Sequence, residues 1–275
     1  MERLIRLLSL KPIILGLIAM LISGATFPLA GVLIIRNSLI PMRYMLMHGV
    51  ILGGIFSIAL GLPLVPVVIV LNLLLVLIMA FVNKERTNGF SAVSTAMMVC
   101  TMGLASMFSH IFDVPAKDTL ELLWGSPFAL TRSDLCILAV LAVMLVIYVC
   151  VGFKQISMVF FDSDIAQSMG VNVRLHNFFM LLVTALVISI AMKMIGALLI
   201  DALVVLPVVA VGQNARGLKN LFVKSSVTGF VISLTGYFTA LLFNLPVSGV
   251  LAILSILLLI FYKIIKIGNR IGEER

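Results

Sequence analysis

The sequence predicts an all-α, polytopic integral membrane protein of about nine transmembrane helices, and three observations lead to that prediction. Of the 275 residues, 62% are hydrophobic and only 11% are charged. Apolar runs of about 20 residues, the length needed to cross a bilayer, recur through the whole chain. These runs leave no room for a soluble catalytic domain, so we expect a single transmembrane domain covering residues 1–275.

The nine expected spans succeed one another with short connections. The first run begins at Pro12 and is too long for a signal peptide, and because it lacks a small-residue cleavage site we expect it to be retained. The sixth and seventh spans are separated only by Lys193 and Gly196. The expected spans are 13–35, 44–61, 64–82, 90–111, 134–153, 175–192, 194–213, 225–243 and 247–267.

The net charge of +8 mainly indicates orientation, because excess Lys and Arg in a membrane protein mark the cytoplasmic side and do not point to nucleic acid. Nine spans place the two termini on opposite sides, and the basic C-terminal tail is expected inside. Thirteen of the 19 Lys and Arg residues then lie in the cytoplasm and six lie outside. This asymmetry supports the orientation.

A polar stretch at 161–171 separates two long apolar runs and carries the signals of a short helix. The side chain of Asp162 or Ser163 is expected to accept backbone N–H bonds at the helix start, and Asp164 favours the positive end of the helix dipole. Gly170 can adopt the left-handed conformation that ends a helix. We therefore predict a separately capped helix between two spans.

That helix has one apolar face. Ile165 and Met169 are four residues apart, so they share a face that a simple connector does not need. Two interpretations stay open at this point: a docking surface for another protein, and a plain turn between spans.

Ionisable residues within apolar runs are candidates for function, because charge inside a membrane is costly. Asp201 is the acid that lies clearly within a span, and Pro207 removes a backbone donor and is expected to kink the same helix. His48 lies early in the second span, and imidazole suits Zn, Mn or Fe. The alternative for Asp201 is an acid satisfied by Ser, Thr or backbone groups at a helix break, and the alternative for His48 is a side chain bonded to a neighbouring helix.

His110 and Asp113 are three residues apart at the outer end of the fourth expected span. On one helix face they form a candidate outer receiving point for an arriving cation, and the plainer interpretation is a surface pair at a helix end. Three cysteines without metal-ligand spacing are expected to be small packing residues: Cys100, Cys136 and Cys150. Most of the 16 Met residues are interpreted as flexible packing.

No Gly-rich phosphate loop, nucleophile–base arrangement or metal-hydrolase spacing is present in the sequence. We therefore expect a protein that is not an enzyme and that takes its energy from elsewhere. Five stretches, in order, resemble the membrane permease of ABC importers for divalent metals, the zinc/manganese/iron class called ABC-3. They are Val32–Arg36 leading to His48 and Gly53, Leu123–Ser126 with Ser133–Leu135, Phe161–Asp162 with Ala166 and Gly170–Val171, Lys193–Gly196 through Leu206–Pro207, and Asn244–Gly249.

The resemblance implies a type II-like bundle, similar to the vitamin B12 permease, in the cytoplasmic (inner) membrane of a bacterium or archaeon. It implies a permease homodimer, a separate ATP-binding ABC subunit and an extracytoplasmic metal-binding protein, with no tightly bound cofactor and a divalent metal ion as cargo. The loop at 161–176 resembles the cytoplasmic coupling helix that docks on the ATPase. The residues that match it are Asp162, Asp164, Ile165, Ala166, Met169 and Gly170.

Two departures from the family pattern concern the metal ligands. The family usually has an Asp four residues before the His of the second span, but Tyr44 occupies that position here, next to Arg43. Conversely, Asp201 stands where a small residue is common. One hypothesis is that the acid has moved, so that Asp201 and His48 together meet the ion. The other is a different substrate.

Three alternatives remain at the level of sequence. A permease for siderophores, haem or vitamin B12 shares the polar stretch, although such chains are usually longer. An ion-coupled secondary transporter calls for more paired intramembrane charges than Asp201 supplies. A membrane-embedded enzyme is disfavoured by the missing acid–base or metal constellation.

Overall fold

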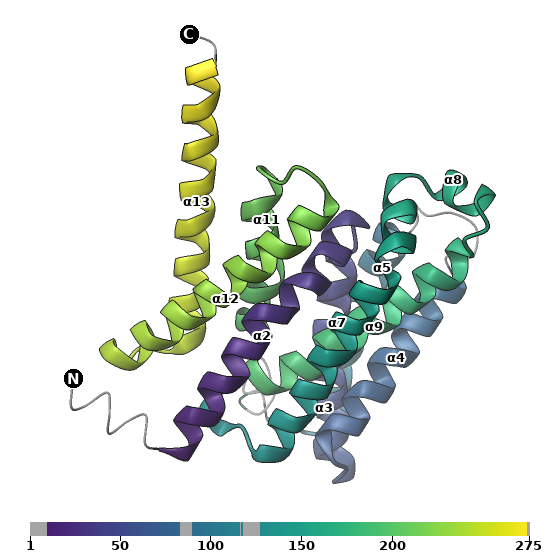
Figure 1. Cartoon of the computed structure of the whole chain (residues 1–275). Coiled ribbons are helices and arrows are strands. Elements are labelled where there is room, and N and C mark those ends of the chain that lie inside the picture. Colours follow the sequence, from purple (N-terminus) through teal and green to yellow (C-terminus); the bar gives the residue numbers. More distant parts are fainter. Residues whose placement is uncertain (1–9, 83–89, 116, 118–126, 274–275) are drawn as a thin grey trace. The chain divides into compact units, whose positions relative to one another are not determined.

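A computed structural model describes residues 10–82, 90–115, 117 and 127–273, and for residues 90, 193–194 and 265–273 only the helical backbone is described. Over these ranges the chain is helical and contains no β-strand (Figure 1). The stretch at 123–126 that contributes to the family resemblance lies outside the described residues, as does the rest of 118–126.

The helices match the apolar runs of the sequence closely. In chain order they are α2 (Lys11–Arg36), α3 (Ile40–Leu60), α4 (Leu64–Val82), α5 (Phe90–Ile111), η2 (Pro127–Ala129), α7 (Arg132–Phe161), α8 (Ser163–Ser168), α9 (Val173–Ile195), α10 (Ala197–Ile200), η3 (Asp201–Val205), α11 (Leu206–Gly212), α12 (Leu218–Phe243) and α13 (Val247–Glu273). Residues with left-handed backbone end two of them: Gly61 closes α3 with φ +64°, and Asn244 closes α12 with φ +55°.

Eight of the helices described are long and apolar enough to cross a membrane, and a ninth apolar segment, Ala197–Gly212, is shorter. The prediction of a continuous span at 194–213 is therefore wrong: Gly196, with φ +91°, ends α9, and the π-helical turn η3 interrupts the helix that begins at Ala197. Other boundaries differ as well. The fifth span continues to Phe161, the eighth begins at Leu218 and the ninth continues to Glu273.

The chain forms two compact units, each assembled from segments that are distant in the sequence. Unit 1 comprises Met1–Val32, Ser126–Val146 and Leu198–Arg275, and unit 2 comprises Leu33–Gly125 and Ile147–Ala197. Helix α2 begins in unit 1 and α3 belongs wholly to unit 2.

In unit 1, polar bonds and close backbone contact join α2 to α12. The hydroxyl of Tyr237 donates to the carbonyl oxygen of Ile13 at 2.6 Å, and Ser233 donates to the carbonyl oxygen of Met20. A methyl group at Gly24 would overlap Ser233, so glycine lets the two backbones approach closely. The buried tyrosine and serine thus find partners inside the apolar unit.

In unit 2, α3 packs between α4, α5 and α9. Gly53 allows close contact with α4, since a methyl group there would lie 3.1 Å from Cα of Val68. On the other side, Phe56 and Phe108 place their ring centroids 5.0 Å apart, and Phe112 joins them. Aromatic packing thus holds α5 against α3.

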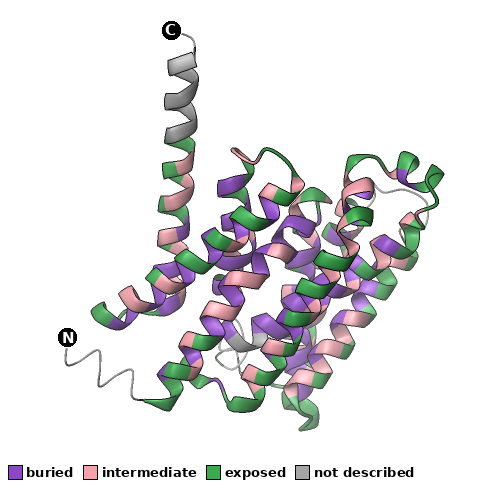
Figure 2. Cartoon of the chain, viewed as in Figure 1, coloured by how far each residue is buried: buried purple, intermediate pink, exposed green. Residues whose placement is uncertain are grey.

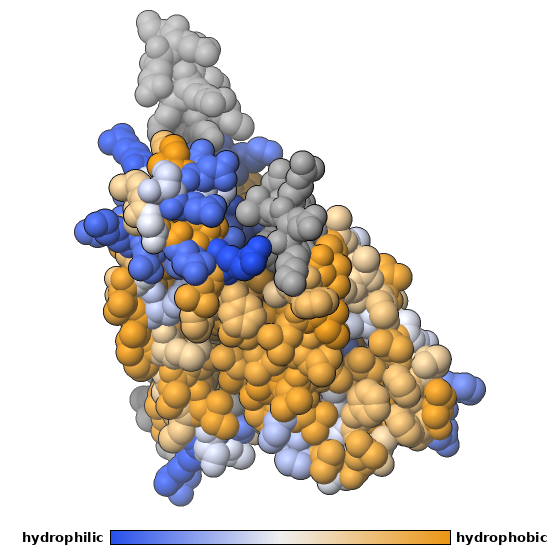
Figure 3. Space-filling model, turned by 90° about the vertical axis from the view of Figure 1, so that its right-hand side faces the viewer, coloured by the Kyte–Doolittle hydropathy of each residue, from blue (hydrophilic) through white to orange (hydrophobic). Residues whose placement is uncertain are grey.

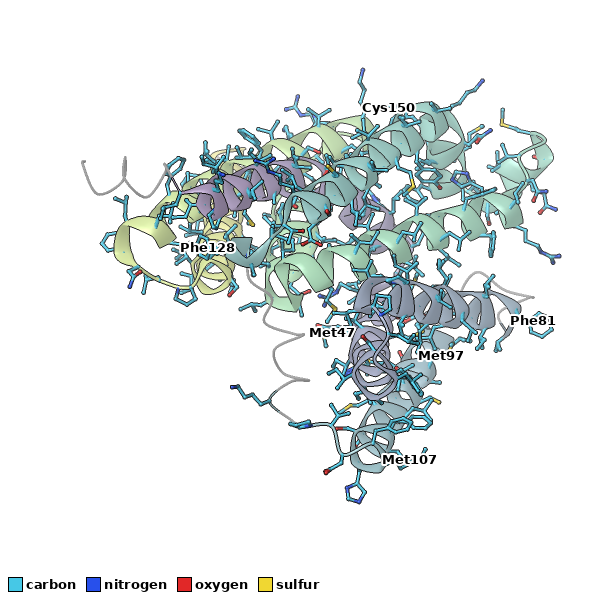
Figure 4. All side chains as sticks on the ribbon, turned by 90° about the horizontal axis from the view of Figure 1, so that it is seen from below. Met47, Phe81, Met97, Met107, Phe128 and Cys150 are labelled. Carbon is cyan, nitrogen blue, oxygen red and sulfur yellow. The ribbon has the colours of Figure 1, made fainter. Side chains whose placement is uncertain are left out.

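Many of the exposed side chains are hydrophobic. On the face shown in Figure 3, hydrophobic side chains cover the middle, and hydrophilic ones gather at the upper and lower ends. Cys100, Cys136 and Cys150 are all exposed on the chain, and Figure 4 labels Cys150 on α7. Their prediction as packing residues is wrong, because each falls on an outer helix face.

The buried fraction differs widely between apolar helices. Of the span-length part of α9, 67% of residues are buried, against 17% for α5 and 22% for α13 (Figure 2). Met47 and Met97, labelled in Figure 4, come from the adjacent helices α3 and α5 and are half-buried, as expected of flexible packing residues. The most enclosed helix of unit 2 is the one that comes directly after α8.

Candidate functional site

The polar stretch at 161–171 folds as the predicted short helix, α8. One carboxylate oxygen of Asp162 accepts the backbone N–H groups of Asp164 at 2.8 Å and Ile165 at 3.0 Å, so Asp162 is the N-cap and Ser163 is the first helical residue. Gly170 comes just after the helix with φ +87° and ends it, a conformation open to glycine at little cost.

The outer surface of α8 is partly apolar. Ile165 is 48% exposed, and Met169, which is the C-cap residue just beyond the helix, is 66% exposed, whereas Ala166 is fully buried. Ala166 was predicted together with them as a coupling residue, but its methyl group faces inward, where α8 packs on α9. The exposed pair is therefore free to meet another molecule, and Ala166 seats the helix.

The connection from α8 to the next span is also capped. The side-chain oxygen of Asn172 accepts the N–H of Leu175 at 3.0 Å and starts α9, a cap that the sequence analysis missed. One turn into α9, the ring of His176 stacks on Tyr148 of α7 with centroids 6.2 Å apart. This ring contact joins α7 and α9, the two helices that precede and follow α8 (Figure 1).

His48 lies in α3, in unit 2, and is half-buried. Its neighbour Gly49 is buried against α4, where a methyl group would overlap the amide oxygen of Asn72. One turn earlier, Arg43 is only 6% exposed and its guanidinium carbon lies 4.2 Å from the ring centroid of Tyr44. A buried cation thus lies directly before Tyr44, the position at which the family usually has an acid.

Asn72 is the polar residue that the sequence analysis missed. It is fully buried at the centre of α4, whose other residues are all apolar. A single amide in an otherwise apolar helix could have indicated a buried hydrogen bond. Its partners could not be predicted, because they lie on α3 and α9 and are distant in sequence.

Asp201 begins the π-helical turn in unit 1 and is half-buried. The backbone N–H of Leu206 reaches back to the carbonyl oxygen of Asp201, five residues earlier, and Pro207 has no N–H to offer to Ala202. Instead, the hydroxyl of Ser255 on α13 donates to the carbonyl oxygen of Ala202 at 3.2 Å. The irregularity at this place is a π-helical turn just before Pro207, and the carbonyl oxygen of Ala202 is satisfied by another helix.

His110 and Asp113 are both exposed at the end of α5. The helix ends at Ile111, and Asp113 has a left-handed backbone with φ +51°. The prediction that the two share one helix face is therefore wrong, because Asp113 lies beyond the helix. Their role as a receiving point for a cation stays a prediction.

The candidate metal ligands are dispersed over the two units. Among the described residues, no group of three or more His, Cys, Asp or Glu side chains could hold a metal ion. His48 belongs to unit 2 and Asp201 to unit 1, so their joint contact with one ion stays a prediction. A transport pathway needs weak ligation so that the ion can leave.

A many-span helical bundle with a small capped helix between two spans, and with isolated ionisable residues inside others, defines a membrane transport permease. The chain belongs to the ABC 3 transport family, whose model matches residues 10–266. It is therefore a transport subunit and a multi-pass protein of the cytoplasmic membrane, and the predicted all-α permease bundle is confirmed.

Relatives and a solved structure match nearly the whole chain. The manganese import system permease protein ScaB of Streptococcus gordonii is 24% identical over 245 residues, which is 88% of this chain and 87% of that protein. The high-affinity zinc uptake system membrane protein ZnuB of Buchnera aphidicola is 24% identical over 252 residues, or 91% and 95%. The structure of PsaBC from Streptococcus pneumoniae in complex with Fab has a similar fold, with a TM-score of 0.80, 22% identity and coverage of 95% and 94%.

Proposed function

We propose that this chain is the membrane subunit of an ATP-driven importer that moves a divalent metal ion, such as manganese, zinc or iron, into the cell. The metal is cargo and not a resident cofactor. The proposal is supported by the curated relatives, which are named as manganese and zinc permeases and match this chain over most of its length.

The energy comes from a separate ATP-binding subunit that docks on α8. The observation that carries this step is the exposed pair formed by Ile165 on α8 and Met169 at its C-cap, in a segment that the Asp162 cap and the Gly170 turn give a fixed shape. An apolar side chain on a small rigid helix is the kind of anchor that fills a groove on a partner. Two copies of the permease and an extracytoplasmic metal-binding protein complete the complex that we propose.

The ion meets His48 and Asp201 during its passage. Imidazole and carboxylate oxygen both suit Mn²⁺ and Zn²⁺, and two ligands hold an ion less tightly than a closed four-ligand site. Alternating access then results from motion of α8: ATP binding in the partner moves the helix, and the path opens inward.

An uptake assay tests the proposal. Cells that express the complete system are given radiolabelled manganese, zinc and iron at limiting concentration, with an ATPase variant unable to hydrolyse ATP as the negative control. We expect ATP-dependent accumulation of at least one of the three ions. Accumulation that is independent of the ATPase contradicts the proposal.

In the same assay, Asp201→Asn tests the relocated ligand. We expect the KM for the metal to rise by about tenfold, the equivalent of one lost ligand interaction of about 1.4 kcal/mol. Asp134→Asn is the matched control, because that carboxylate serves the start of α7 by accepting the hydroxyl of Thr131 at 2.8 Å. Unchanged uptake by Asp201→Asn discards the relocated ligand but leaves the importer in place.

One observation favours a second cargo, an anionic metal chelate. Arg43 is buried one turn before His48, and a cation there repels a bare metal ion and attracts a negatively charged complex. A chelator separates the two cargoes: excess citrate lowers uptake of a free ion and raises uptake of a chelate.

A further inference from the structure

The buried amide of Asn72 joins three helices at one point. Its side-chain nitrogen donates to the carbonyl oxygen of Leu46 on α3 at 3.2 Å and to the hydroxyl oxygen of Ser189 on α9 at 2.7 Å. Ser189 in turn donates to the carbonyl oxygen of Ala185 in its own helix at 2.6 Å. Both donor hydrogens of the amide are therefore used, one on each neighbouring helix.

The amide oxygen of Asn72 faces the same turn of α3. It has no hydrogen-bond partner and is buried against Gly49, where any side chain would overlap it. A buried polar group inside an apolar span is costly, so its retention needs a physical reason. Leu46 and Gly49 lie on either side of His48 in the chain. The Asn72 side chain therefore contacts the turn of α3 that carries His48, the candidate metal ligand.

Through Ser189, the side chain of Asn72 is also connected to α9, the helix that packs against α8. Ser189 belongs to α9, one continuous helix of 23 residues from Val173 to Ile195. This helix starts just after α8, packs against it and is mostly buried. A helix that is packed along its length moves as a body, so a displacement at its α8 end reaches Ser189.

We propose that Asn72 is a positioning residue that ties the His48 turn of α3 to α9, so that movement of α8 changes the exposure of His48. The proposal rests on the proposed function for the direction of the signal, from the ATPase to the ion pathway. Asn72 itself does not contact the ion. It acts through the backbone of the turn that it holds.

The proposed linkage between α8 and the His48 turn can be tested by the accessibility of position 48 to a thiol reagent. This test needs no assumption about the cargo. His48→Cys is made in a chain whose three native cysteines are replaced by Ala, and the complex with its ATPase is labelled with a maleimide, with and without ATP. We expect ATP to change the labelling rate by about fivefold or more, the equivalent of about 1 kcal/mol. With Asn72→Leu, which keeps four side-chain heavy atoms branched at the same carbon but loses the hydrogen bonds, we expect that change to disappear.

Ser189→Ala provides a second, milder variant in case Asn72→Leu folds poorly. It removes the partner on α9 and is expected to abolish the ATP response as well, while Ser189→Thr keeps the hydroxyl and restores it. Because Asn72 and Ser189 act through one bond, the double variant is expected to be no worse than either single one. Ser94→Ala is the control, because its buried hydroxyl joins α5 to Met79 of α4 at 3.1 Å and so bonds a different pair of helices.

The outcomes separate the two proposals. An ATP response that persists in Asn72→Leu and Ser189→Ala, or that is lost equally in Ser94→Ala, overturns the linkage. Failure of the proposed function is seen elsewhere, as absent metal uptake by the unmodified complex. A labelling response that depends on Asn72 supports the linkage whichever cargo is moved.

Discussion

The chain interrupts its apolar spans at two places by different physical means. At α8, the interruption is made by neighbours in sequence: Asp162 caps the helix, and Gly170 ends it. At η3, the helix widens just before Pro207, which has no N–H, and the carbonyl oxygen of Ala202 accepts the hydroxyl of Ser255 at 3.2 Å, from 53 residues further along the chain.

The two interruptions differ in whether their shape depends on neighbouring residues in the sequence or on a distant helix. A helix defined by its own caps keeps its shape when its surroundings change, which suits a docking element. A turn that depends on another helix responds when that helix shifts, which suits a moving pathway. We therefore expect α8 to tolerate changes elsewhere in the fold and η3 to be sensitive to α13.

The largest effect is expected from charge on the apolar face of α8. Replacing both Ile165→Glu and Met169→Glu puts two carboxylates where the ATPase is proposed to bind, so we expect loss of ATPase co-purification and of metal uptake. Gln167→Glu, at an exposed position of the same helix, is the control. Full uptake by the double variant would show that α8 is a simple connector.

The next effect concerns η3. Ser255→Ala leaves the carbonyl oxygen of Ala202 without its partner inside the fold, and we expect a loss of stability of about 1–3 kcal/mol. Thermal unfolding in detergent measures it, with Thr239→Ala as the control, because that hydroxyl bonds within its own helix at 2.7 Å. Adding Pro207→Ala supplies an N–H and should recover part of the loss. No recovery would argue against Pro207 as the cause of the π turn.

A smaller effect is expected at the end of α8. Gly170→Ala forces a side chain into the left-handed region, at a cost of about 1–2 kcal/mol. Open space surrounds this position, so the cost is conformational and not steric. Binding of the ATPase, measured by titration of the detergent-solubilised chain, should weaken accordingly, and Gly170→Asn should weaken it less. Equal binding by all three chains would show that the end of α8 is not fixed.

The smallest effect is expected at the cap. Asp162→Ala removes the acceptor of two backbone N–H groups and should cost about 1 kcal/mol, or about fivefold in ATPase affinity. Asp162→Ser keeps a cap and should restore most of the affinity. If Ser and Ala behave alike, the carboxylate does not act as a cap.

The spans and α8 could be predicted from sequence because their causes are local: apolar run length for the spans, and Asp162 with Gly170 for the helix. The prediction from sequence failed where the local structure depends on a contact between residues that are distant in the chain. The bond of Asn72 to Ser189 joins residues 117 positions apart, and the η3 turn depends on Ser255. The cysteines show a second limit, because an apolar run does not tell which helix face meets lipid and which meets protein.

Transport by the reconstituted complex tests the proposed ATP-driven import most directly. The chain is placed in proteoliposomes with its ATP-binding subunit and the extracytoplasmic binding protein, and radiolabelled manganese and zinc are followed across the bilayer with and without ATP. We predict transport that requires ATP and the ATP-binding subunit together. Transport by the chain alone, at the same rate without ATP, would contradict that prediction.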